Sequence, residues 1–145
     1  MLVTRDAVLP VGLDDAWVAL TTWEDQARWM KDADWVRVES AQREGVGTRI
    51  AVKTRIYNVP LFAERMEVLA WEPPTRLLMA HRTFVRGTGE WRLAAEDAGS
   101  TRFTWTEDVT IPPPVLGDLA ALVYRPFMRR LMGASLRDLV EHLSR

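Results

Sequence analysis

The last part of the chain, residues 114–145, is the feature that most constrains the fold. Its apolar residues recur at three- and four-residue steps, a spacing that predicts a helix with a wide apolar face. The apolar members of this series are Leu116, Leu119, Ala120, Val123, Phe127, Leu131 and Ala134, with Asp138 in the next position. Because Pro126 strains a helix interior, we expect either a kink there or a short helix followed by a long one with Pro126 in its first turn.

The segment that starts at Pro126 is long enough to cover a sheet. It contains 19 residues up to Ser144, which span about 28 Å in an α-helix. A strand of nine residues reaches a similar length, about 30 Å. The helix can therefore lie along a sheet, and most of the upstream sequence has the pattern of strands.

Alternation of apolar and polar residues predicts a first strand over residues 2–10, two short helices from Asp14 and over 24–30, and six further strands. The turns between strands are expected at 44–47, 58–60, 72–75, 87–89 and 97–100, and Pro112–Pro114 is expected to end the sheet. Tight turns between consecutive strands favour an antiparallel meander. We predict one α+β domain over residues 1–145, in which a curved antiparallel sheet of about seven strands wraps the C-terminal helix.

Composition excludes several classes of function. The chain has 145 residues, a net charge of -1 and no cysteine, so nothing indicates nucleic-acid binding, and disulfides, zinc thiolates and a cysteine nucleophile are excluded. Its two histidines are far apart and no nucleotide-binding fingerprint occurs. We expect no metal, no cofactor and no integral membrane segment, and a cytoplasmic location fits the absence of cysteine. The seven tryptophans suit a large core or an apolar pocket.

A series of loosely spaced motifs covers nearly the whole chain and consists of Trp17, Trp29, Gly45–Arg49, Glu64–Val68, Pro73–Leu77, Gly89–Leu93 and Gly99–Trp105. This series resembles the START-like (SRPBCC) superfamily, in particular its polyketide cyclase/dehydrase and lipid-transport branch. The resemblance implies a helix-grip fold with a cavity between the sheet and the C-terminal helix. It implies less about function, because the superfamily includes ligand carriers, aromatases and cyclases, hydrolases and chaperone-associated domains.

Glu64 and Glu107 are the main candidates for chemistry, because each shares a strand face with apolar neighbours. A carboxylate in such a place is desolvated, so its pKa should rise and it could act as an acid or base or bind a ligand. The alternative is structural: each side chain turns outward or pairs with an arginine. His81 could shuttle a proton if it faces the cavity, or be an ordinary strand histidine.

The interpretation that we favour is a protein that binds an apolar or aromatic small molecule, lipid-like or polyketide-like, in an internal cavity. A polyketide aromatase/cyclase that uses Glu64, His81 and Glu107 as acid/base groups is the alternative, and a protein-interaction domain with a filled cavity is a third possibility. The expected partner is a hydrophobic small molecule, and the protein a monomer or homodimer. The predicted cavity lining is Ile50, Val52, Thr54, Glu64, Met66, His81, Trp91, Phe103, Trp105, Glu107, Val123, Phe127 and Leu131. We expect a cavity of a few hundred Å³ with its mouth near one end of the long helix.

Overall fold

The computed structural model describes residues 1–56, 58–110 and 117–145, and its order of elements is the predicted one. The expected end of the sheet at Pro112–Pro114, and the side chains of Leu116, Leu119 and Ala120, lie outside the described residues. The elements are β1 (Leu2–Leu9), α1 (Leu13–Thr21), the 3-10 helix η1 (Trp23–Arg28), β2 (Ala33–Val38), β3 (Arg49–Ile56), β4 (Val59–Glu72), β5 (Arg76–Arg82), β6 (Arg86–Asp97), β7 (Ser100–Thr110) and α2 (Gly117–Leu143).

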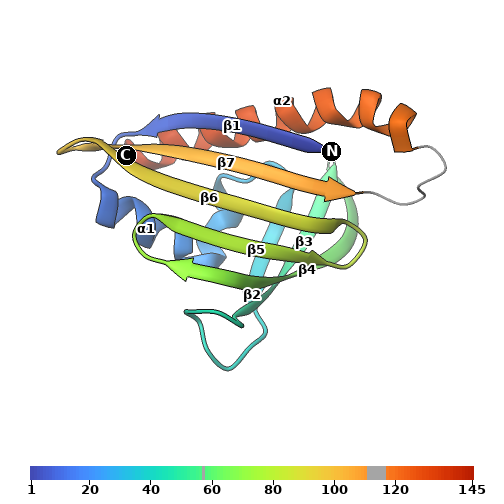
Figure 1. Cartoon of the computed structure of the whole chain (residues 1–145), viewed down its shortest axis with the longest axis horizontal. Helices are drawn as coiled ribbons and strands as arrows, with labels where there is room; N and C mark the ends of the chain where they lie inside the picture. The colour runs from blue at the N-terminus through green and yellow to red at the C-terminus, as the bar shows by residue number, and fades with distance from the viewer. Residues whose placement is uncertain (57, 111–116) are drawn as a thin grey trace.

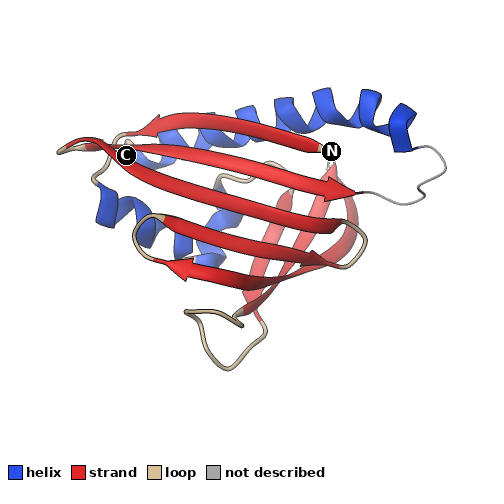
Figure 2. Cartoon of the chain, viewed as in Figure 1, coloured by secondary structure: helices blue, strands red, loops and turns tan. Residues whose placement is uncertain are grey.

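The strands form one antiparallel sheet in the order β1-β7-β6-β5-β4-β3-β2. Strands β2 to β7 follow one another as the predicted meander, and β1 joins the sheet beside β7. The sheet curls so that β2 and β3 pass behind the other strands, while α2 runs along β1 (Figure 1). Figure 2 shows the same arrangement as a layer of strands that curves around the helices. The fold is thus the α+β helix-grip fold that the sequence predicts.

Strand β7 shows how alternation positions the core. Its residues 101, 103, 105, 107 and 109 are buried, and the residues between them are partly or fully exposed. The inward side chains include Phe103 and Trp105, which together with Trp91 and Trp29 form a group of aromatic contacts. The period of two therefore places Glu107 on the same buried face as these rings.

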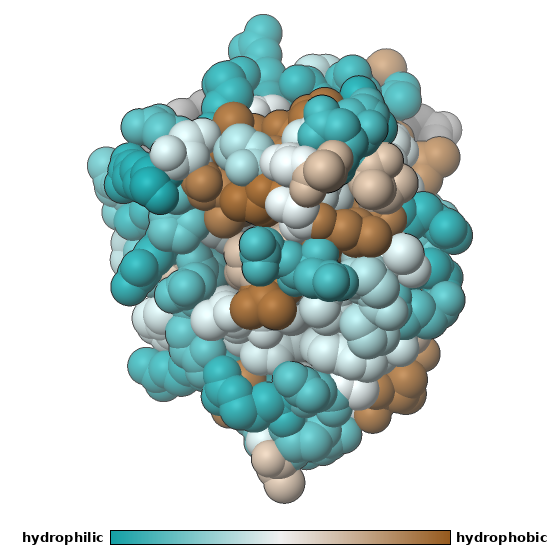
Figure 3. All heavy atoms as spheres, turned by 90° about the vertical axis from the view of Figure 1, so that its left-hand side faces the viewer, coloured by the Kyte–Doolittle hydropathy of each residue, from teal (hydrophilic) through white to brown (hydrophobic). Residues whose placement is uncertain are grey.

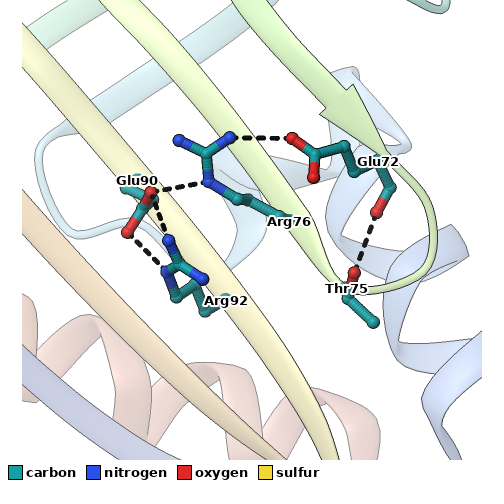
Figure 4. Close-up of polar contacts among 5 residues, drawn as sticks. All are labelled: Glu72, Thr75, Arg76, Glu90 and Arg92. Carbon is teal, nitrogen blue, oxygen red and sulfur yellow. Dashed lines mark hydrogen bonds and ion pairs between the residues drawn. The ribbon is translucent and has the colours of Figure 1, made fainter.

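The outer face of the sheet carries ion pairs between neighbouring strands. Arg76 on β5 donates to Glu72 at 2.7 Å and to Glu90 on β6 at 2.8 Å, and Arg92 also donates to Glu90 at 2.8 Å (Figure 4). Burial of Glu90 opposes its charged form, but the hydrogen bonds from the two arginines outweigh burial and lower its pKa. Arg92 therefore pairs on the outer face and not with an inward carboxylate.

Helix α2 continues through Pro126 as one helix, and the residues that it buries differ from those predicted. Val123 was expected to cover the core but is 73% exposed, and Phe127 and Leu131 are only partly buried. The buried face instead consists of Met132, Gly133, Ser135, Leu136 and Leu139.

The shift of this face is explained by close packing at small residues. A Cβ at Gly133 would lie 2.8 Å from the guanidinium of Arg5 on β1, and the Ser135 hydroxyl accepts a 3.0 Å hydrogen bond from the backbone of Lys31. Glycine and serine do not count as apolar residues in a hydrophobicity pattern. The pattern therefore does not show that α2 packs closely against the rest of the protein at Gly133 and Ser135.

Arginines attach α2 to one edge of the sheet. Strand β1 is an edge strand, and its free carbonyls at Leu2 and Thr4 accept hydrogen bonds from Arg125 at 3.1 Å and from Arg129 at 3.2 Å. These arginines therefore cover an edge that would otherwise be open to pairing. Because α2 follows β1, it is held away from β3 and β4, and space remains between the helix and those strands.

Candidate ligand-binding site

An internal cavity of about 160 Å³ lies between α2 and the concave face of the sheet. Its wall is mainly apolar, and its polar members come from η1, from the loop before β2, from β3, β4, β5 and β7, and from α2. The lining residues are Gln26, Met30, Asp32, Ile50, Val52, Thr54, Arg55, Leu61, Phe62, Glu64, Met66, Leu77, Met79, His81, Val85, Gly89, Trp91, Trp105, Glu107, Val109, Tyr124, Phe127, Met128, Leu131 and Met132.

Of the thirteen residues predicted to line the cavity, eleven do so, and Phe103 and Val123 do not. Phe103 is fully buried in the core, where its ring packs edge-on against that of Trp91 with 5.6 Å between the ring centroids. Val123 is exposed at the surface of α2. Contact of the eleven residues with a ligand stays a prediction.

The cavity is smaller than the few hundred Å³ that we expected. Large side chains reach into the space between the sheet and α2, and both Trp91 and Trp105 lie in the wall. An apolar cavity of about 150 Å³ is nevertheless large enough to hold a benzene molecule. The observed volume is therefore suited to a single ring.

A second, wider depression of about 620 Å³ lies outside the cavity. It is lined by Lys31, Arg55, Asn58, Val123, Pro126, Phe127, Arg130, Leu131 and Ala134. Arg55, Phe127 and Leu131 line both spaces, so these side chains lie between the cavity and the depression. The depression follows the middle turns of α2, from Val123 to Ala134. The expectation of a mouth near one end of the helix stays a prediction.

His81 and Glu107 form a direct hydrogen bond in the cavity wall. His81 Nε2 lies 2.8 Å from Glu107 Oε2, and Trp105 Nε1 donates to Glu107 Oε1 at 2.9 Å. The Glu107 residue is only 7% exposed, and His81 Nδ1 is buried without a partner among the described residues. Each carboxylate oxygen carries one hydrogen bond and retains a lone pair for a ligand donor.

Gly89 on β6 allows this hydrogen bond to form across a strand. His81 is on β5 and Glu107 on β7, and β6 lies between them with Gly87 opposite His81 and Gly89 opposite Glu107. A Cβ at Gly89 would lie 3.0 Å from both carboxylate oxygens of Glu107, whereas a Cβ at Gly87 would run into the backbone of Asp108 on β7. We expected Gly87–Gly89 to be a turn, but β6 already begins at Arg86. A glycine on the inward face of a strand, at Gly89, is the sequence signal that was missed.

Glu64 is buried and held by partners at the turn after β5. The residue is 6% exposed, and it accepts hydrogen bonds from the Thr83 hydroxyl at 2.8 Å and from the Val85 backbone at 3.2 Å. The structural alternative of an arginine partner does not hold within the described part of the chain, where Arg55 pairs with Asp34 and Arg82 with Glu67.

Several negative charges act on His81. Burial opposes the charged imidazole most strongly, but the hydrogen bond with Glu107 and the charges of Glu107, Glu64 and Asp32 outweigh it and raise the pKa of His81. Burial, with the charges of Asp32 and Glu64, raises the pKa of Tyr124 as well. The cavity therefore favours a protonated His81 paired with Glu107.

Asp32 is a cavity residue that sequence reasoning did not identify. It directly precedes β2, and its carbonyl accepts a 2.8 Å hydrogen bond from the Arg55 backbone. Burial, assisted by the charge of Glu107, raises the pKa of Asp32 against the opposing effects of its own backbone, His81 and Arg55. No strand alternation extends to this loop position, so the sequence pattern gives no sign that its side chain faces inward.

Exposed apolar side chains gather around the start of β4 and the β5–β6 turn. Leu61 and Phe62 are exposed and also line the cavity, and the ring centroid of Phe62 lies 5.1 Å from that of Phe84. This turn and the start of α2 lie at the right-hand end of Figure 1. The left-hand end is mostly hydrophilic, with small separated hydrophobic areas (Figure 3).

Two features are absent from the described residues. No helix there is long and apolar enough to cross a membrane. No group of three or more histidine, aspartate or glutamate side chains is placed to hold a metal ion in the part of the chain that the structure describes.

Solved structures of low sequence identity share this fold along nearly their whole length. TTHA0849 from Thermus thermophilus is 17% identical with a TM-score of 0.83, covering 99% of this chain and 97% of that one. The ZhuI aromatase/cyclase from Streptomyces sp. R1128 is 17% identical with a TM-score of 0.78, and the match covers 100% of this chain and 94% of that one. A START superfamily protein from Mycobacterium smegmatis is 14% identical with a TM-score of 0.72, and the match covers 98% of this chain and 93% of that one.

The family follows from the sequence match as well as from the fold. No curated protein sequence matches the chain at a significant level. A family model described as polyketide cyclase / dehydrase and lipid transport matches residues 2–144. This match confirms the resemblance in the motifs, and the chain belongs to the polyketide cyclase / dehydrase and lipid transport family.

Proposed function

We propose that this protein binds a compact apolar or aromatic molecule in its internal cavity, with a polar group of the ligand directed at the His81–Glu107 pair. The observation that carries the proposal is a mainly apolar space between the sheet and α2 with a hydrogen-bonded acid–base pair in its wall. Ligand sites in proteins are commonly apolar with a few convergent polar groups. The cavity size favours one ring inside, with any larger part of the ligand in the outer depression.

The burial of polar groups also supports a ligand. Glu64, Glu107 and His81 all line the cavity wall, and polar groups facing an empty apolar space would lack part of their hydrogen bonding. Water or a ligand polar group in the cavity satisfies them. The third possibility, a filled core without a site, is less compatible with this arrangement.

Calorimetric titration with benzyl alcohol tests the proposal, because this molecule combines one ring with one hydroxyl. Leu131→Trp places a larger side chain between the cavity and the depression and should weaken binding about tenfold or more. Leu122→Trp puts the same side chain on an exposed part of α2 and serves as the matched control. Binding that is equal in both variants and in the wild type, or absent in all three proteins, would contradict the proposal.

A cyclase or dehydratase-type activity is the second candidate, and the His81–Glu107 hydrogen bond is the observation that favours it. Such a pair can exchange a proton with a bound molecule. If the protein is an enzyme, Glu107→Gln should lower turnover of a polyketide-like substrate about 10²–10⁴-fold while binding persists. If it is a carrier, the same variant should change affinity by a modest factor.

A further inference from the structure

One cavity carboxylate has no role in the acid–base pair. Asp32 lines the cavity beside β3, and within the described residues the only hydrogen bond to its carboxylate comes from its own backbone. Asp32 is partly accessible and lines the cavity, and burial raises its pKa. Part of its surface is therefore available to a molecule in the cavity.

The groups around this carboxylate do not neutralise it. Glu107 and His81 act on it from β7 and β5, and Arg55 acts from β3. Tyr124 of α2 experiences the charges of both Asp32 and Glu64. His81 is already bonded to Glu107, and the guanidinium of Arg55 pairs with Asp34 at 3.0 Å. The cavity wall thus holds three carboxylates, and its histidine and arginine are both engaged elsewhere.

We propose that Asp32 is a ligand-binding residue and that it selects ligands with a hydrogen-bond donor, above all a protonated amine attached to an apolar or aromatic body. This inference rests on the proposed binding function and specifies, in addition, that the preferred ligand carries a positive charge. A cationic donor supplies the partner that Asp32 lacks, and it offsets the negative charge of Asp32 and Glu64, which have no cationic partner among the described residues of the cavity wall. An anionic ligand would add a further negative charge to the same low-dielectric space.

The test uses three probes of similar size with one ring: benzylamine, benzyl alcohol and benzoate, titrated by calorimetry at neutral pH. The wild-type protein should bind benzylamine at least about tenfold more tightly than benzoate, because hydrogen bonds to charged groups are worth about that factor or more. Asp32→Asn keeps the shape of the side chain and removes its charge. It should weaken benzylamine binding about tenfold and change benzyl alcohol binding by less than about threefold.

The matched control is Asp108→Asn, which removes the same charge from an exposed position on the outer face of β7. This variant should bind benzylamine as the wild type does. If benzyl alcohol binds but benzoate competes equally with benzylamine, or if Asp32→Asn and Asp108→Asn behave alike, the role of Asp32 is overturned and the binding function stands. If none of the three probes binds, the proposed function itself fails.

Discussion

Gly89 of β6 lies directly against the carboxylate of Glu107: a methyl group at position 89 would be 3.0 Å from both carboxylate oxygens. The absence of a side chain here lets Glu107 reach across the strand to His81. The regular geometry of a strand thus joins two residues that are 26 positions apart in the sequence.

Substituting this glycine should separate the pair. In Gly89→Ala the new methyl group displaces the Glu107 carboxylate, so the pKa of His81 should fall toward its ordinary value of 6.5. NMR titration of the imidazole signals measures this change. Stability should change by about 1 kcal/mol or less, because a flexible side chain can yield. Gly99→Ala, where the nearest atom to the new methyl group is 4.0 Å away, should leave the titration of His81 as in the wild type. An unaltered titration in Gly89→Ala would refute the account.

The ion pair should also make stability depend on pH. The folded pKa of His81 is raised above 6.5, so its stabilising contribution is complete below the unfolded pKa and is lost as pH rises through the folded pKa. Urea unfolding of the wild type and of His81→Gln should therefore differ more at about pH 5.5 than at about pH 8.5. A difference that is constant over this range would show that the pair does not stabilise the fold.

The charge of Asp32 should destabilise the folded protein at neutral pH, in contrast to the stabilising His81–Glu107 pair. Burial raises its folded pKa above 3.8, so the charged carboxylate destabilises the folded state at pH values above its folded pKa, and this cost vanishes below 3.8. Asp32→Asn removes this buried charge and should raise the free energy of unfolding at pH 7 by roughly 0.5–2 kcal/mol, a gain that stabilising substitutions commonly give. The gain should shrink in acid. A loss of stability at pH 7 would indicate that Asp32 has a structural partner.

Much of the fold is predictable from the sequence because period-two alternation fixes which face of a strand is buried. Glu64 and Glu107 were placed inward on this basis, and both are buried. The phase of α2 was not predictable, since its close contacts use Gly133 and Ser135. Asp32 precedes its strand, and the meeting of His81 with Glu107 depends on the register of three strands, so no local pattern reveals either.

The corrected face of α2 can be tested by two truncations. Leu139 is fully buried, so Leu139→Ala should destabilise by about 2–5 kcal/mol. Val123 is exposed, and Val123→Ala should change stability by less than about 0.5 kcal/mol. Chemical denaturation of both variants gives the comparison. Equal losses of stability would mean that the N-terminal turns of α2 cover the core after all.

The central claim is that a compact ligand enters the internal cavity, and the methionine methyl groups report on this most directly. Five of the six methionines line the cavity, namely Met30, Met66, Met79, Met128 and Met132, whereas Met1 does not. The measurement is a titration of methyl-¹³C-methionine-labelled protein with benzyl alcohol, followed by NMR. Saturable shifts at the five cavity methyl groups, with the Met1 signal unchanged, are the predicted result. Shifts that never saturate, or that affect Met1 as much as the other five, would contradict the claim.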